Sequence, residues 1–239
     1  MSRAAQAVGS RVLLVGVVLW GLAGCQTSPP AAPPVAPGNP AELAIPAGAR
    51  VFKVVPAESL LQILVYRGGA MAKLGHNHVV ASHQLSGAVY ATEDPTATRF
   101  EIRFPVTELT IDEPELRAAA GPDFPAGVPQ NAREGTHTNM LSEALLDGEQ
   151  YPEIRLRATG IRSAGDGEHY DAEVEVTIKG QSHLLRVPFT AKWQTDELRA
   201  SGEFPLKQSE LGLKPFSIAM GALVVLDQMQ VRFRLTARQ

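Results

Sequence analysis

Strict two-residue alternation of apolar and polar side chains is the feature that most constrains how this sequence can fold. In residues 100–104, Phe100, Ile102 and Phe104 alternate with charged residues. The same alternation runs through residues 174–178 and 229–235, and an apolar phase also recurs through residues 185–193. Because successive side chains of a strand point to opposite faces, this pattern predicts antiparallel strands with one buried and one solvated face.

Turn-forming residues separate these segments. They cluster at residues 164–167, 179–181 and 194–196, and about eight strands fit between Val51 and Arg238. Eight antiparallel strands can bury an apolar face as a sandwich or as a closed barrel, and periodicity leaves both open. The space inside an eight-stranded barrel is wide enough for side chains or for one small ligand.

One or two short helices are expected between the strands. In residues 138–146 the apolar side chains fall on one helical face, and Thr138 is a suitable N-cap. A further turn is expected at residues 209–212. The stretch 112–135 is rich in Pro, Gly and Ala and is long for a connection within a sheet, which predicts a functional or mobile loop.

The N-terminal residues predict export and lipid attachment. Arg3 and Arg11 precede an apolar run at residues 12–22, which is shorter than the ~20 residues that a membrane span needs. The run ends in Leu-Ala-Gly-Cys at residues 22–25, which resembles the lipobox of bacterial lipoproteins. This resemblance implies cleavage before Cys25 and a diacylglyceryl group on its thiol. Gln26, rather than Asp, follows the cysteine, and in this resemblance that favours sorting to the outer membrane.

The residues after Cys25 are expected to form a tether. Prolines recur through residues 26–49, and proline fixes φ and removes a hydrogen-bond donor, so this segment is predicted to be extended and semi-rigid. The chain is therefore expected to consist of a signal peptide (1–24), an acylated tether (25–49) and a β-barrel domain (50–239). Anchored in the outer membrane, the domain would face the periplasm.

Composition and motifs narrow the function classes. The 22 basic and 25 acidic residues leave a formal charge of −3, which argues against a nucleic-acid partner. The sequence has one cysteine, no P-loop and no Gly-x-Ser-x-Gly motif. A non-enzymatic protein without a cofactor is therefore expected.

Several short motifs occur in a characteristic order along the domain. They are Leu-Gly-His-Asn-His at 74–78, Leu-Ser-Gly at 85–87, Tyr-Pro-Glu-Ile at 151–154, Val-Thr-Ile-Lys-Gly at 176–180 and Leu-Gly-Leu at 211–213. From Phe52 to Ala237 this order resembles the YceI-like family of periplasmic polyisoprenoid-binding proteins. The insert at 112–135 and the Gly75-His76-Asn77-His78 sequence depart from the commonest family pattern. The resemblance implies an extended, lipocalin-like antiparallel barrel around an elongated apolar cavity.

The inward-facing apolar residues are the candidate ligand contacts. Alternation alone is equally consistent with a solid core, whereas the resemblance implies a cavity that holds an isoprenoid lipid, a quinone tail or a similar amphiphile. The expected function is carriage or sequestration of such a lipid in the cell envelope. The interior residues are Phe100, Phe104, Val106, Val176, Ile178, Val187, Phe189, Val231 and Phe233.

The histidines leave several interpretations open. His76 and His78 would project to one side of an extended segment, where they could hold a ligand head group, bind a metal with His183, or only bond the backbone of a turn. The alternative function is an envelope lipoprotein that binds a metal or a partner through residues 75–78.

Two further expectations concern the insert. A protein that binds a partner through this segment should expose apolar side chains between residues 118 and 128, including Phe124 and Val128. The acidic residues Asp112, Glu113 and Glu115 are expected to form a solvated patch.

Overall fold

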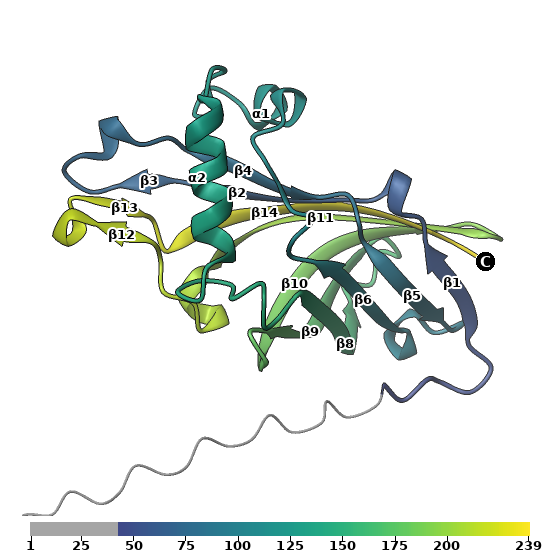
Figure 1. Ribbon diagram of the computed structural model, residues 1–239. Coiled ribbons are helices and arrows are strands. Elements are labelled where there is room, and N and C mark those ends of the chain that lie inside the picture. The colour runs from purple at the N-terminus through teal and green to yellow at the C-terminus, as the bar shows by residue number, and fades with distance from the viewer. Residues whose placement is uncertain (1–42) are drawn as a thin grey trace, which may run out of the picture. The chain divides into compact units, whose positions relative to one another are not determined.

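Strands dominate the protein, as the alternation predicts. The computed structural model describes residues 43–239 (Figure 1). The segments at 100–104, 174–178, 185–193 and 229–235 all lie in strands. In chain order the strands are β1 (Arg50–Val54), β2 (Leu60–Val65), β3 (Arg67–Gly68), β4 (His78–Ser82), β5 (Ser86–Ala91), β6 (Arg99–Pro105), β7 (Thr110–Ile111), β8 (Glu153–Ser163), β9 (His169–Ile178), β10 (Gln181–Trp193), β11 (Glu197–Lys207), β12 (Ser217–Ile218), β13 (Leu223–Val225) and β14 (Gln228–Arg238).

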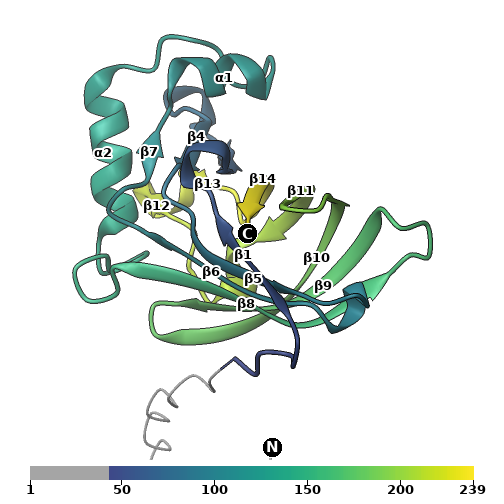
Figure 2. The same cartoon turned by 90° about the vertical axis from the view of Figure 1, so that its right-hand side faces the viewer.

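The main sheet closes into a barrel. Its strands follow the order β1-β5-β6-β8-β9-β10-β11-β14, and β14 pairs back to β1 through Lys53 opposite Arg238 and Val54 opposite Ala237. All of these pairings are antiparallel. The expected eight-stranded antiparallel barrel is therefore confirmed, and the sandwich is excluded. Figure 2 shows β8, β9, β10 and β11 curving side by side in its wall.

The barrel is extended at one end. β1 pairs with residues 237–238 of β14 and β2 with residues 230–234, so the two strands follow one another along the same neighbour. A 3-10 turn at Pro56–Glu58 separates them, and the hydroxyl of Ser59 accepts the Thr236 N–H at 3.1 Å within this break. β4 and β7 extend the sheet beyond β2, and β3, which follows β2 in the chain, joins β13 and β12 in a second, small sheet.

The two-residue period sorts buried from exposed side chains. In β9 the residues Tyr170, Ala172, Val174, Val176 and Ile178 are all buried, and the side chains between them are not. The Lys179–Gly180 turn that follows has φ of 50° and 69°, as a two-residue hairpin with primed geometry requires. The turns at 164–167 and 194–196 also connect strands, as predicted.

Two helices lie between β7 and β8, and here the sequence prediction was partly wrong. They are α1 (Pro114–Ala120) and α2 (Gln130–Leu141). The predicted helix at 138–146 instead ends at Leu141, Thr138 lies within α2 rather than at its N-cap, and residues 142–148 form turns. The stretch 112–135, expected as a loop, contains α1 and the start of α2. Pro114 occupies the first turn of α1, where a missing N–H has no helical partner to lose, and Pro129 is the N-cap residue directly before α2.

Short 3-10 turns complete the regular structure. The turn expected at 209–212 is η4 (Gln208–Leu211), ended by Gly212 in the left-handed region. The others are η1 (Pro56–Glu58), η2 (Ala72–Leu74), η3 (Pro95–Ala97) and η5 (Ala219–Gly221).

The predicted signal peptide, Cys25 and most of the tether lie outside the described residues. Residues 43–49 contain a turn but neither a helix nor a strand. Within residues 43–239 no helix has the length and apolar character needed to cross a bilayer.

Candidate functional site

The barrel encloses a cavity of about 470 Å³. This volume lies within the range of about 300–1,000 Å³ typical of small-molecule sites. Alternation alone was equally consistent with a solid core and with a cavity, and the structure has a cavity. All eight apolar residues proposed as ligand contacts line it: Phe100, Phe104, Val176, Ile178, Val187, Phe189, Val231 and Phe233. Val106, which was expected in the same interior, is instead buried in the core and is not part of the lining.

The cavity wall is mainly apolar along the barrel, and most of its polar side chains lie at the end covered by α2; Thr98 and Gln208 also line it. Leucine, isoleucine, valine and phenylalanine side chains from β2, β6, β8, β9, β10, β11 and β14 make up most of the wall. At the α2 end the lining includes Arg67, His76, His78, Thr136 and Asn139. This distribution suits an amphiphile whose tail fills the barrel and whose polar group lies beneath α2.

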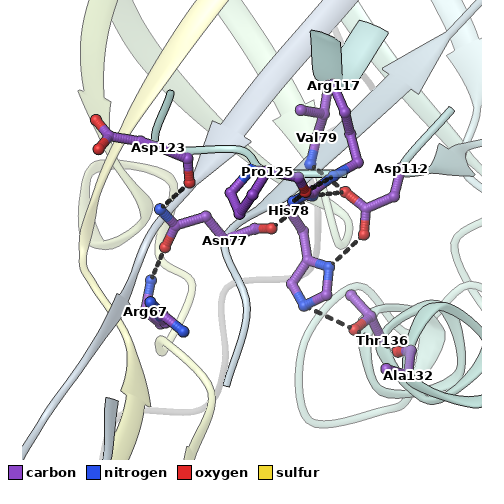
Figure 3. A network of polar contacts seen from close by, with 10 residues as sticks. All are labelled: Arg67, Asn77, His78, Val79, Asp112, Arg117, Asp123, Pro125, Ala132 and Thr136. Carbon is purple, nitrogen blue, oxygen red and sulfur yellow. Dashed lines mark hydrogen bonds and ion pairs between the residues drawn. The ribbon is translucent and has the colours of Figure 1, made fainter. Parts of the chain in front are cut away.

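His78 is held in place on both sides of its ring (Figure 3). Its Nδ1 lies 2.6 Å from Asp112 Oδ2, and its Nε2 lies 3.2 Å from the hydroxyl oxygen of Thr136 in α2. Because an ionised carboxylate only accepts hydrogen bonds, His78 Nδ1 carries a hydrogen in the contact with Asp112. His78 therefore links β4, the start of the insert and α2 at the polar end of the cavity.

Asp112 is not part of a solvated acidic patch, and that expectation was wrong. Its side chain is fully buried, and its backbone has a φ of 58° directly after β7. The other carboxylate oxygen accepts the Val79 N–H at 2.9 Å and Arg117 Nη1 at 2.5 Å. Glu113 and Glu115, in contrast, reach the surface, where Glu113 pairs with His83 at 2.9 Å.

Arg117 joins the insert to the barrel. From α1 it donates from Nη1 to the carbonyl of Asn77 at 2.7 Å and from Nη2 to the carbonyl of Pro125 at 2.7 Å, while also pairing with Asp112. The residue is 4% exposed, so these bonds replace the water that a buried guanidinium needs. Sequence reasoning did not identify Arg117; Pro114, as a helix-start signal, was the one indication that a helix places it here.

Electrostatics favour the charged form of Asp112. Burial alone raises the pKa of its carboxyl, but hydrogen bonds from His78, from the Val79 N–H and from Arg117 outweigh burial and hold that pKa below its usual range. A stable carboxylate in turn fixes which nitrogen of His78 carries the hydrogen. The network thus fixes the orientation of His78 at the polar end of the cavity.

His76 differs from His78 because it is free to meet a ligand. Within residues 43–239 its ring nitrogens have no hydrogen-bond partner, and the two histidine rings lie 6.1 Å apart between centroids. Burial lowers the pKa of His76 below 6.5, and the neighbouring charges of His78, Arg67 and Arg117 lower it further. At neutral pH His76 therefore offers a neutral imidazole that can donate and accept.

The three histidines considered as metal ligands do not come together. His183 has the inward phase of β10, but its ring packs against Gly212 and does not line the cavity. Both ring nitrogens of His78 already have partners. In the part of the chain that the structure describes, no three His, Cys, Asp or Glu side chains are grouped to hold a metal ion.

The insert also lacks the exposed apolar anchor that a partner-binding loop would need. Phe124 is 3% exposed and packs edge-on against Tyr66 at 5.4 Å between ring centroids, with the Arg117 guanidinium 5.8 Å from its ring. Val128 is half-buried. Phe124 is therefore not the exposed residue that a partner-binding insert predicts, because it packs with Leu64 of β2, Val79 and Tyr66.

Comparison with known proteins places the fold. Residues 52–237 match the YceI-like domain family. BcnA of Burkholderia cenocepacia is similar in structure at 18% identity, covering 77% of this chain and 99% of that one, with a TM-score of 0.57. A polyisoprenoid-binding domain from Saccharophagus degradans, implicated in plant cell wall breakdown, matches at 9% identity over 78% and 97% of the two chains, with a TM-score of 0.51. No curated protein matches the sequence.

Proposed function

The chain belongs to the YceI-like domain family, and on that premise we propose that it is a non-enzymatic carrier or sequestering protein for an isoprenoid lipid or a similar amphiphile. The observation that carries this proposal is the cavity of about 470 Å³ with an apolar wall and one polar end. The fold shared with a domain described as polyisoprenoid-binding also supports it.

The energetics favour a long apolar ligand. Burying a few hundred Å² of prenyl chain at ~25 cal/mol per Å² contributes on the order of 10 kcal/mol before costs. Loss of translational freedom and ordering of the chain offset much of this. The remainder is enough for useful affinity without any catalytic group, and the polar end favours ligands that carry a hydrogen-bonding group.

Extraction tests the proposal directly. The purified protein is extracted with organic solvent, the extract is analysed by mass spectrometry, and uptake of an added fluorescent prenyl lipid is measured. We expect a prenyl lipid or quinone in the extract and saturable uptake of the probe. Repeated absence of both would exclude a lipid carrier.

A matched pair of variants ties uptake to the cavity. Ala200 lines the cavity from β11, whereas the next residue, Ser201, faces outward and is exposed. Ala200→Phe should reduce uptake at least tenfold by filling space that the ligand needs, and Ser201→Phe, with the same ring outside, should leave uptake near wild type. Equal uptake by both variants would place binding outside the barrel.

We also propose that the protein acts in the cell envelope, attached to the outer membrane and facing the periplasm. The lipobox-like residues 22–25 and Gln26 support this location.

A further inference from the structure

Two hairpins project from the end of the barrel that holds the polar residues of the cavity. One comprises residues 66–76, with β3 and η2, and the other comprises residues 212–226, with β12, η5 and β13. Together they are called the lip. β13 pairs with β3, and Met71 donates its N–H to the carbonyl of Ala222 at 2.7 Å. Figure 1 shows β3, β12 and β13 side by side at this end.

The lip exposes a concentration of apolar side chains. Of the ten large apolar residues exposed within residues 43–239, six lie on it: Met71, Leu74, Phe216, Ile218, Met220 and Leu226. Leu74 is 69% exposed, and Met220 projects entirely into solvent. Ala219 and Met220 both have positive φ, of 50° and 55°, which turns the tip of the second hairpin outward. Exposed apolar patches of this kind mark interaction sites.

The charges of the lip have one sign. Residues 66–76 contain Arg67 and Lys73, residues 212–226 contain Lys214, and neither segment contains Asp or Glu. The acidic groups that border the lip are paired with other residues. Asp227 is bonded to Ser209 at 2.8 and 2.7 Å, Glu210 accepts the Lys207 N–H at 2.8 Å, and buried Asp112, near His76, pairs with His78 and Arg117. A chain with net negative charge thus presents a positive, apolar surface at one place.

The lip adjoins the cavity. Phe216 and the residues of β13 both belong to the lip and line the cavity. At the base of the first hairpin, Gly69 lets the two backbones approach, because a Cβ there would lie 2.5 Å from the carbonyl oxygen of Ala222. A surface seated on the lip would therefore be next to the polar end of the cavity.

We propose that the lip docks on a bilayer containing anionic phospholipids. Met220, Leu74 and Ile218 enter the acyl boundary, and Lys73 and Lys214 remain at the level of the phosphates. Apolar side chains flanked by lysines bind such interfaces by combining apolar burial with attraction to anionic head groups. The lip is positively charged, contains no acidic residue and ends in narrow projecting tips. These features favour an anionic bilayer, rather than a flat protein surface, as its partner. Docking of the lip does not require the proposed ligand to be correct. If both proposals hold, docking would bring the polar end of the cavity next to a source of lipid.

Depth measurement tests the proposal. In the full chain carrying Cys25→Ser, a spin label is attached at Met220→Cys or, as the matched control, at Asp166→Cys in the β8–β9 turn at the opposite end of the barrel. On vesicles of phosphatidylcholine and phosphatidylglycerol, the label at 220 should become accessible to oxygen and protected from a water-soluble nickel complex. The label at 166 should stay in water. Equal immersion of both labels, or a label at 220 that stays in water, would overturn the proposal.

Charge reversal separates the lip from general electrostatics. Lys73→Glu with Lys214→Glu should lower partitioning to these vesicles about tenfold or more. Lys53→Glu with Lys192→Glu, which makes the same change in net charge away from the lip, should have little effect, and an equal loss in both pairs would contradict the proposal. Uptake of prenyl lipid is measured without vesicles in parallel. Failure of docking with normal uptake would refute the lip alone, and normal docking without uptake would refute the carrier function alone.

Discussion

The polar end of the cavity depends on one buried carboxylate. Asp112 bonds His78, Arg117 and the Val79 N–H at once, and its side chain has no contact with solvent. Breaking a buried ion pair by removing one partner costs about 3–5 kcal/mol, because it leaves an uncompensated charge. Asp112 is therefore expected to matter for folding more than any acidic residue on the barrel surface.

Asp112→Asn tests this directly. The variant retains an acceptor for Val79 but leaves Arg117 without its counter-charge, so we expect the free energy of unfolding at pH 7 to fall by about 3 kcal/mol. Urea denaturation measures the change. The control is Asp166→Asn, which removes an exposed partner of His169 and should have a much smaller effect. Equal stability of Asp112→Asn and wild type would show that the network does not stabilise the fold.

The same residue predicts how stability varies with pH. The pKa of Asp112 is lower in the folded protein than in the unfolded chain, so the unfolded state binds more protons in acid. The contribution of Asp112 should be complete above about pH 4, its unfolded pKa, and should be lost as the pH falls through the lower folded pKa. Urea titrations from neutral pH downward should therefore show a steeper acid loss for wild type than for Asp112→Asn. Parallel curves would contradict this assignment.

His76 and His78 are predicted to have different roles. His76 lines the cavity without a partner among the described residues, so His76→Ala should weaken binding of a prenyl alcohol by about fivefold, the value of one hydrogen bond. Binding of the corresponding prenyl hydrocarbon should change little. His169→Ala, at the exposed start of β9 at the other end of the barrel, is the control. A similar loss for alcohol and hydrocarbon would indicate that His76 only packs against the ligand.

The sequence of α2 gives this helix little intrinsic support. It contains Gly135, Thr136, Thr138 and Asn139, which are weak helix formers, yet Ala132, Thr136, Asn139 and Met140 form part of the cavity wall. Tertiary packing therefore determines this helix, as it does for most short helices. Helix α2 therefore covers one end of the cavity with low intrinsic stability. Such a helix can open locally at low cost, which suits a cavity that must admit a long ligand.

Gly135→Ala is expected to stabilise this cover. A Cβ at Gly135 meets no atom within 4 Å, so the substitution should gain up to about 1 kcal/mol from helix propensity. Hydrogen exchange of the α2 amides should slow, and uptake of prenyl lipid should become slower. Gly87→Ala is the contrasting case: its φ is 123° and its Cβ would lie 2.1 Å from the Glu101 carbonyl oxygen, so it should destabilise. No change in α2 exchange would mean that another element admits the ligand.

The sequence allowed prediction of the strands better than of the insert. Alternation identified β6, β9, β10 and β14 because each strand has one buried and one wet face, and the same phase selected eight residues that line the cavity. Nothing in that periodicity distinguishes a hollow barrel from a filled one. The insert was mispredicted because its stability comes from Asp112 and Arg117, which are five residues apart and meet only in the folded chain. Charged residues near prolines ordinarily indicate a solvated loop, whereas here Asp112 and Arg117 are buried.

At the scale of the whole molecule, we propose two membrane contacts, the lip and an acyl anchor on Cys25, which differ in physical kind. Docking of the lip relies on a few lysines and exposed apolar side chains, so it should be reversible and weakened by salt. An acyl anchor on Cys25 would be insensitive to salt, because each buried methylene contributes about 0.8 kcal/mol and the proposed anchor would carry more than one chain. Washing membranes with concentrated salt should therefore leave the acylated protein bound.

The last prediction concerns the residues that would direct the protein to its membrane. Cells grown with labelled palmitate should incorporate the label into the wild-type protein and not into Cys25→Ser, because the thiol is the proposed site of attachment. The variant should also retain residues 1–24, since cleavage would require the modified cysteine, and its mass would show this. Gln26→Asp should keep the label but move the protein from the outer to the inner membrane on a density gradient. Label in Cys25→Ser would refute acylation at this residue, and an unchanged position of Gln26→Asp would refute Gln26 as the sorting signal while leaving the anchor intact.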